Sequence, residues 1–144
     1  MCQLAKEWID RAQSAEDVYD KFISAYIALN FLYNERNERC ERDRMVNYLL
    51  DMTDCLKIEM PAAQIIGEYL AHPVINMTPR SSKKHQPQKV SDKRSLFEAI
   101  YQVRCNLFHG NKTLGDPRDR RLVAQGADVI IDILTRAKTR GCCF

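Results

Sequence analysis

Apolar residues recur at helical spacing along most of the chain, and this repeat constrains the fold more than any other feature of the sequence. The clearest case lies between residues 92 and 110, where successive apolar positions are four, three and four residues apart. Such spacing places them on one stripe of a helix. The stripe contains Leu96, Ile100, Val103 and Leu107, and Phe97, Tyr101 and Phe108 widen it. No segment alternates with the period of two that a half-buried strand shows, so the sequence predicts an all-α fold.

The same pattern predicts further helices and a single domain spanning residues 1–144. They cover residues 4–12, a stretch from a cap at 14–17 to about 34, residues 41–57, residues 60–70, and a stretch from a cap at Asp116 to about 139. An acidic cap followed by Pro117 at the first helical position is typical of a helix start. We therefore expect a bundle of four to six helices.

Residues 73–91 interrupt the helical pattern. This segment holds three prolines and a polar, basic stretch that includes Lys83 and Lys84, and it predicts a flexible loop. A second loop at 110–115 contains two glycines and Lys112. These three lysines are candidate contacts to a phosphate backbone, and the alternative is that they are only solvated.

Charge is divided unevenly along the chain. Residues 1–79 carry 8 Lys and Arg against 13 Asp and Glu, a balance of −5, whereas residues 80–144 carry 14 against 6, a balance of +8. The second half therefore favours a phosphate-bearing partner, because neutralising phosphates is the main source of nucleic-acid affinity.

Several classes of protein are not expected from this sequence. No apolar run approaches the roughly 18 residues that span a bilayer, and the first residues lack the pattern of a signal peptide. We therefore expect a cytoplasmic protein with no membrane association. The six cysteines show no Cys-x-x-Cys pair and no zinc-ligand spacing, so we expect free thiols, no metal and no cofactor.

Three polar residues stand near the end of the apolar helix at 92–110. Arg104, Asn106 and His109 cost free energy in such a helix unless each finds a partner. Asn106 and His109 are three residues apart and share a face, while Arg104 and His109 are separated by about 140° of helical rotation. Asn30 is a similar exception in the earlier apolar helix. These residues are either satisfied structurally or converge on a solvated pocket.

The chemistry of these side chains is specific. Imidazole accepts and returns a proton near neutral pH, and the planar fork of guanidinium fits phosphate oxygens. Together, His109 and Arg104 can promote attack of an RNA 2′-hydroxyl on its own phosphodiester, with Arg104 stabilising the growing charge and Asn106 orienting the imidazole or the ribose. The alternative is structural, since a His at a helix C-terminus and a bridging Arg also stabilise folds.

The segment Arg104-Cys105-Asn106-Leu107-Phe108-His109-Gly110 resembles the Arg-x-x-x-x-His signature of the HEPN family (higher eukaryotes and prokaryotes nucleotide-binding domains). Residues 22–34 are similar to the family's long early helix. The resemblance implies an HEPN-like helical bundle that forms a homodimer, with two motifs facing each other across a cleft. It also implies metal-independent endoribonuclease activity in toxin–antitoxin or anti-phage defence systems, with an antitoxin protein as a possible partner. Arg104 and His109 would be the catalytic pair, and Asn106 and Asn30 would support them.

Two alternatives to a nuclease stay open at this stage. The first is a catalytically inactive HEPN module that binds nucleotides or RNA, or that mediates a protein interaction. The second is a purely structural domain in which Arg104 and His109 belong to a packed network.

Overall fold

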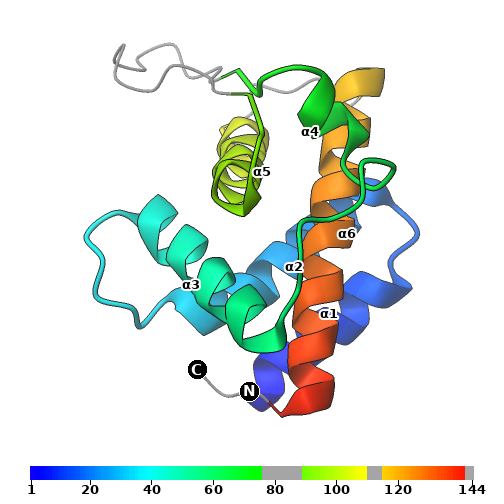
Figure 1. Ribbon diagram of the computed structural model, residues 1–144. Helices are drawn as coiled ribbons and strands as arrows, with labels where there is room; N and C mark the ends of the chain where they lie inside the picture. Colours follow the sequence, from blue (N-terminus) through cyan, green and yellow to red (C-terminus); the bar gives the residue numbers. More distant parts are fainter. Residues whose placement is uncertain (76–88, 110–114, 142–144) are drawn as a thin grey trace.

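The structure is a computed structural model that describes residues 1–75, 89–109 and 115–141. Over these residues the chain forms six α-helices and no β-strand, so the predicted all-α class is confirmed (Figure 1). The helices are α1 (Gln3–Ser14), α2 (Val18–Tyr33), α3 (Glu41–Leu56), α4 (Gly67–Ala71), α5 (Lys93–Phe108) and α6 (Pro117–Arg140).

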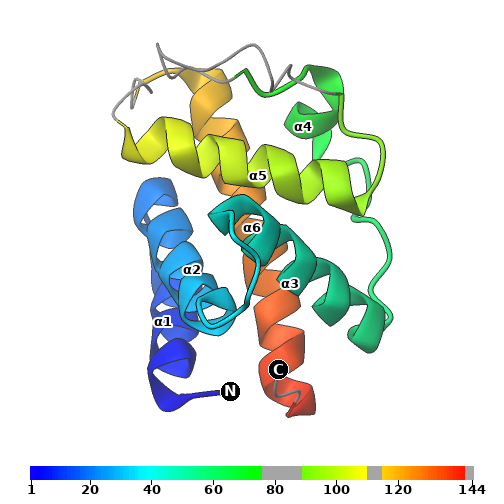
Figure 2. The same cartoon turned by 90° about the vertical axis from the view of Figure 1, so that its left-hand side faces the viewer.

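Helix α6 is the centre of the bundle. It has 24 residues and packs against each of the other five helices. Helices α1 and α2 pack side by side, and α5 crosses α6 near one end of the molecule, with α3 below it (Figure 2). In this arrangement side chains of α5 contact both ends of α3, Lys93 at Asp54 and Arg104 at Glu41.

One continuous hydrophobic core joins all six helices. It is made of buried residues from every helix, such as Phe22, Leu49, Ile100 and Ile130. The apolar stripe predicted for α5 is buried at Leu96, Ile100 and Val103, whereas Phe108 is 49% exposed. Phe108 therefore widens the apolar stripe in the sequence, but it is not buried in the structure.

A glycine in the middle of α6 has a packing reason. The hydroxyl of Tyr69 donates to the carbonyl of Leu122 at 2.7 Å. A Cβ atom on Gly126 would lie 2.6 Å from that hydroxyl oxygen and 3.2 Å from Cε2 of Phe22. Glycine is costly inside a helix, but here it allows two aromatic side chains to approach the helix backbone.

The helix ends follow the capping chemistry of the sequence. Asp17 and Asp116 accept hydrogen bonds from backbone amides of the first turns of α2 and α6. Asp92 and Ser95 form a reciprocal capping box at the start of α5. Gly141 ends α6 in the left-handed conformation, with a φ of 64°, which glycine adopts without steric cost.

The helix predicted for residues 60–70 is wrong in its extent. Only α4 forms there, and residues 63–65 are a turn. Residues 62–65 are exposed, including Ile65 at 46%, so a helix over them would bury no apolar face. Short helices depend on such burial because local propensity alone does not stabilise them.

Some predicted features lie outside the described residues. The predicted loop at 73–91 is described only at its ends, and Lys83 and Lys84 lie outside the described part, as do Lys112 and most of the glycine turn. Cys2, Cys40, Cys55 and Cys105 are free thiols, as predicted. Among the described helices, none is both long and apolar enough to cross a membrane.

Candidate functional site

The last turns of α5 place Arg104 against three aromatic rings. Its guanidinium carbon lies 5.2 Å from the centre of the Tyr26 ring, 5.7 Å from that of Tyr101 and 5.2 Å from that of Phe108. The side chain of Arg104 is 24% exposed, so it is neither free in solvent nor fully buried. Contacts of this kind contribute about 0.5–2 kcal/mol each.

A carboxylate from another helix completes the surroundings of Arg104. Glu41 is the first residue of α3, and its Oε1 lies 3.3 Å from Nη2 of Arg104. The same Oε1 accepts a hydrogen bond from the Tyr33 hydroxyl at 2.8 Å, and Oε2 accepts one from the Tyr101 hydroxyl at 3.4 Å. Two phenols therefore hold the carboxylate in place independently of Arg104.

We call this group the Arg104 cluster and define it as Tyr26, Tyr33, Glu41, Tyr101, Arg104 and Phe108. Its members come from α2, α3 and α5. They combine one cation, one anion and four aromatic rings at a partly exposed position, which is unusual in a core made otherwise of apolar packing.

Asn30 supports this cluster. Its Nδ2 donates to the hydroxyl of Tyr33 at 2.9 Å, and the hydroxyls of Tyr26 and Tyr33 are also 2.9 Å apart. Asn30 therefore reaches Arg104 only through Tyr33 and Glu41. Asn30 thus helps to hold the Glu41 carboxylate, and among the described residues it makes no hydrogen bond with the guanidinium of Arg104.

Asn106 lies in a different environment. It is fully buried, and its Nδ2 donates to the backbone carbonyl of Ile75 at 2.8 Å. Its Oδ1 accepts a hydrogen bond from Gln102 at 2.9 Å. The bond to Ile75 ties α5 to the segment that follows α4, and the bond from Gln102 lies within α5. The structure thus places Asn30 and Asn106 in separate polar networks.

His109 follows α5 directly as its C-cap residue. Its backbone amide donates to the carbonyl of Cys105 at 3.0 Å, and its side chain is exposed. Within the part of the chain that is described, the imidazole makes no hydrogen bond or ion pair, and it has no contact of this kind with Arg104. One copy of the chain therefore carries the two groups on the last turns of one helix without joining them.

Burial changes the acid–base behaviour of the cluster. Burial raises the pKa of Tyr33 to about 12, and it also raises the pKa of Tyr26 and of Tyr101. For Arg104, burial opposes the charged form, yet Tyr26 and Glu41 outweigh it and raise the pKa. At neutral pH the site therefore holds neutral phenols around a fixed cation.

Arg104 keeps unused hydrogen-bond donors. A guanidinium has five N–H groups. Nη2 faces Glu41, Nη1 contacts only the sulfur of Cys105 at 3.9 Å, and Nε is buried and has no partner among the described residues. The two terminal nitrogens are therefore the donors suited to an anionic ligand, since the terminal N–H groups of guanidinium bind carboxylate and phosphate oxygens in pairs.

Of the cluster, the sequence predicted only Arg104 as a site residue; His109 and Asn30, which it also predicted, are not members. The tyrosines lie on apolar rows of the predicted helices, and Glu41 lies in a segment dense in charges of both signs, so neither pattern indicates a site. A usable signal was present. Tyr26 and Tyr33 are seven residues apart on one helix face, and Tyr101 precedes Arg104 by three residues.

A hollow in the surface lies away from the Arg104 cluster. A groove of about 640 Å³ lies between the end of α3, the 57–65 segment and α6, and its lining includes Lys93, Phe97, Asp128 and Arg136. In the described part of the chain, no group of three or more His, Cys, Asp or Glu side chains is placed to hold a metal.

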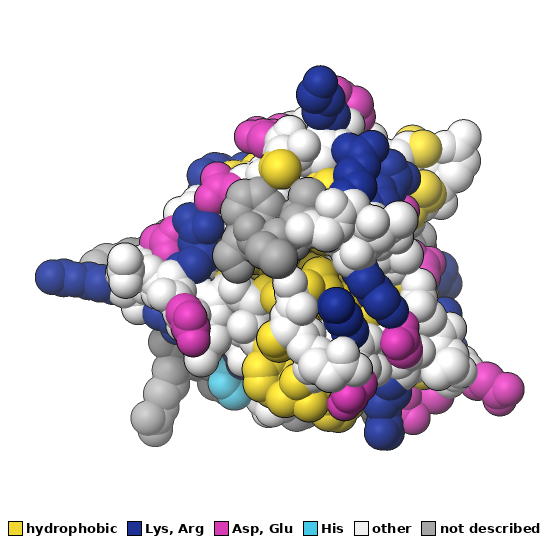
Figure 3. All heavy atoms as spheres, turned by 90° about the horizontal axis from the view of Figure 1, so that it is seen from below, with side chains coloured by type: hydrophobic (Ala, Val, Ile, Leu, Met, Phe, Trp, Pro, Cys, Tyr) yellow, Lys and Arg dark blue, Asp and Glu magenta, His cyan; other side chains and the backbone are white. Residues whose placement is uncertain are grey.

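Basic and acidic side chains are interspersed on the face of the molecule shown in Figure 3, around a hydrophobic area. The positive balance of the second half is not gathered into one patch on that face.

Comparisons of the chain with models of protein families, with curated proteins and with solved structures gave no match.

Proposed function

We propose that this chain is a metal-independent endoribonuclease of HEPN type that acts as a homodimer in the cytoplasm. The observation that carries the proposal is the state of Arg104. Its guanidinium carbon lies within 5.7 Å of three ring centres, its terminal nitrogens contact one carboxylate oxygen and one sulfur among the described residues, and it lies on the same helix end as the exposed imidazole of His109. The resemblance to the Arg-x-x-x-x-His signature gives this geometry its chemical interpretation.

The reaction needs only these side chains and the RNA. The imidazole of His109 accepts the proton of a 2′-hydroxyl, whose oxygen attacks the adjacent phosphorus. Arg104 stabilises the charge that develops on the phosphoryl oxygens, and the 5′-oxygen leaves as it takes up a proton. The products are a 2′,3′-cyclic phosphate and a 5′-hydroxyl. Because Arg104 and His109 do not contact each other within one copy, a second copy would bring a second pair to the same phosphate.

The biological setting that the resemblance implies is a toxin or an anti-phage defence effector. Uncontrolled RNA cleavage would harm the cell, so such a protein would be neutralised by an antitoxin protein. Asn30 belongs to this proposal as support for Tyr33, and Asn106 as the residue that ties α5 to the segment after α4.

The test is incubation of the purified protein with total RNA in EDTA, followed by gel analysis. We expect cleavage by the wild type and none by His109→Ala. A matched control is His72→Ala, because His72 is also exposed and lies outside the Arg104 cluster. The fragments should carry 2′,3′-cyclic phosphate ends. Equal cleavage by a highly purified His109→Ala sample would refute the proposed role of the imidazole.

A second candidate is a non-catalytic RNA- or nucleotide-binding module. The observation that favours it is the ion pair between Arg104 and Glu41, which occupies part of the guanidinium in the absence of RNA. This function predicts RNA affinity that falls as salt rises, without any cleavage product. The gel assay and a binding titration over a range of salt concentrations separate the two functions.

A further inference from the structure

Phe108 is the outermost ring of the Arg104 cluster. It is the last residue of α5, directly before His109 and four residues after Arg104. Its ring centre lies 6.3 Å from that of Tyr26 at an interplanar angle of 56°. Tyr26 is only 3% exposed, whereas Phe108 is 49% exposed. The cluster therefore has a buried aromatic side and an open aromatic side.

The chemistry of Phe108 limits what this open side does. A phenyl ring has no hydrogen-bonding group and moves no proton, so it takes no part in the reaction proposed above. Single exposed apolar residues are common on protein surfaces. Phe108 differs from them in position, because one neighbour is the guanidinium, 5.2 Å from its ring, and the next residue is the exposed imidazole.

We propose that Phe108 is a stacking platform for an unpaired nucleobase next to the phosphate that Arg104 binds. The proposal rests on the proposed function, and it deepens that function by assigning the residue that binds a base of the single-stranded RNA substrate. Aromatic side chains bind splayed bases by stacking, and this binding tolerates sequence because every base has a π-face. Paired RNA would be excluded, because its bases already stack on one another.

The platform places a base and a phosphate in adjacent positions. A base on the open side of Phe108 would have its sugar beside His109 and a flanking phosphate beside the terminal nitrogens of Arg104. The cation behind the ring also strengthens stacking, since guanidinium contributes cation–π attraction. The alternative occupant is a second copy of the chain, which would bury Phe108 in a dimer interface.

The test measures binding apart from cleavage. The probes are a 2′-O-methyl uridine hexamer, which cannot undergo 2′-hydroxyl attack, and the same backbone with abasic sites, both read by fluorescence anisotropy. We expect Phe108→Ala to weaken binding of the base-containing probe about 5- to 150-fold, the range for loss of one stacked base. Binding of the abasic probe should stay the same. Phe31→Ala is the matched control, because Phe31 is 44% exposed on α2 and lies outside the cluster.

Phe108→Trp provides a second readout in a variant that keeps an aromatic ring. It should retain affinity, and its added fluorescence should be quenched by the base-containing probe but not by the abasic one. The wild type gives the background from Trp8, the single tryptophan of the chain.

Three results would overturn the platform. One is an equal loss of affinity for both probes in Phe108→Ala, which would mean that the ring only positions Arg104. Another is unchanged affinity together with a shift from dimer to monomer in sedimentation, which would assign Phe108 to the interface. The third is a wild type that binds neither probe. If base-dependent binding is seen but no cleavage occurs, the platform stands and the proposed nuclease activity fails.

Discussion

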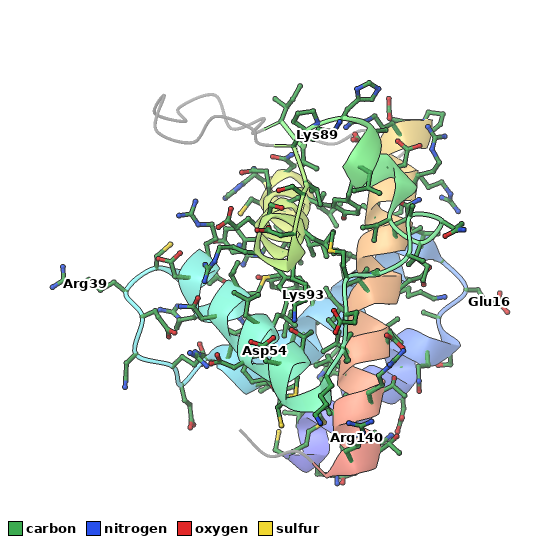
Figure 4. The ribbon with its side chains drawn as sticks, in the orientation of Figure 1. Glu16, Arg39, Asp54, Lys89, Lys93 and Arg140 are labelled. Carbon is green, nitrogen blue, oxygen red and sulfur yellow. The ribbon has the colours of Figure 1, made fainter. Side chains whose placement is uncertain are left out.

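Two cations on α5 contact α3 near its opposite ends, and they are bonded differently. The ammonium of Lys93 donates to Asp54 at 2.8 Å, to the hydroxyl of Thr53 at 3.2 Å and to the carbonyl of Ile58 at 3.3 Å. Figure 4 shows Lys93 and Asp54 directed toward each other between the two helices. Arg104 instead has one carboxylate oxygen at 3.3 Å, one sulfur at 3.9 Å and an unpartnered Nε in the described region.

The difference indicates what each cation is for. An ammonium has three N–H groups, and those of Lys93 have three partners, so Lys93 serves to join the helices. Arg104 is held by rings more than by hydrogen bonds, which fixes its orientation but leaves donors unused. A cation that is preorganised and under-bonded is suited to stabilise charge that develops in a reaction.

The largest effect that would sharpen this comparison is on catalysis. We expect Arg104→Met to lower RNA cleavage about 10²- to 10³-fold, as for loss of one preorganised donor at a developing negative charge. Lys93→Met should leave the cleavage rate per folded molecule unchanged. The measurement is initial cleavage rate for both variants, corrected for the folded fraction. Arg104→Met should stay folded, because methionine packs well against aromatic rings and Glu41 keeps two phenol partners.

The next largest effect is on stability, and here we expect the substitution of Lys93 to cost more than that of Arg104. Lys93→Met removes the donor to Thr53 and Ile58, and we expect a loss of about 1–3 kcal/mol in the free energy of unfolding. Asp54→Asn should cost less than about 1 kcal/mol, because the side chain of Asp54 is 73% exposed. Urea denaturation measures both. If Arg104→Met destabilises the protein more than Lys93→Met does, Arg104 is a structural residue and the comparison fails.

The helices were predictable because local rules determine them. Apolar spacing located α5 and α6, and Asp92, Asp116 and Gly141 supplied starts and an end that the structure confirms. The short α4 was mispredicted, because the fate of residues 60–66 depends on what they pack against and not on their own propensity. The distinction between Lys93 and Arg104 was also not readable, since hydrogen-bond satisfaction depends on partners 35 to 63 residues away in the chain, such as Ile58 and Glu41.

A smaller effect concerns the phenol that holds Glu41. Burial raises the pKa of Tyr33 from its ordinary value of 10.0 to about 12, so the folded state favours the neutral hydroxyl. This contribution to stability is complete below pH 10 and is lost as the pH rises toward 12. Tyr33→Phe should cost about 1 kcal/mol at pH 7 through the lost hydrogen bonds, and it should reduce the fall in stability between pH 10 and 12. The measurement is urea denaturation of wild type and variant across this pH range, with tyrosine ionisation followed by absorbance. If the stability of Tyr33→Phe falls between pH 10 and 12 as steeply as that of the wild type, Tyr33 is not the group whose ionisation destabilises the fold.

The smallest effect tests whether Glu41 competes with a ligand for Arg104. Glu41→Gln keeps one oxygen, which accepts from one of the two phenols, Tyr33 or Tyr101, and it removes the negative charge beside the guanidinium. The pair is partly exposed, so we expect it to be worth about 0.2–1 kcal/mol, and affinity for the 2′-O-methyl hexamer should rise about 1.4- to 5-fold. Glu38→Gln makes the same change in net charge at a carboxylate that pairs with Arg36. An equal rise in both variants would reflect overall charge alone. If affinity for the hexamer falls in Glu41→Gln but not in Glu38→Gln, the carboxylate of Glu41 positions Arg104 for the ligand. The ion pair at this end of α3 would then hold the guanidinium in place, as Asp54 holds Lys93 at the other end.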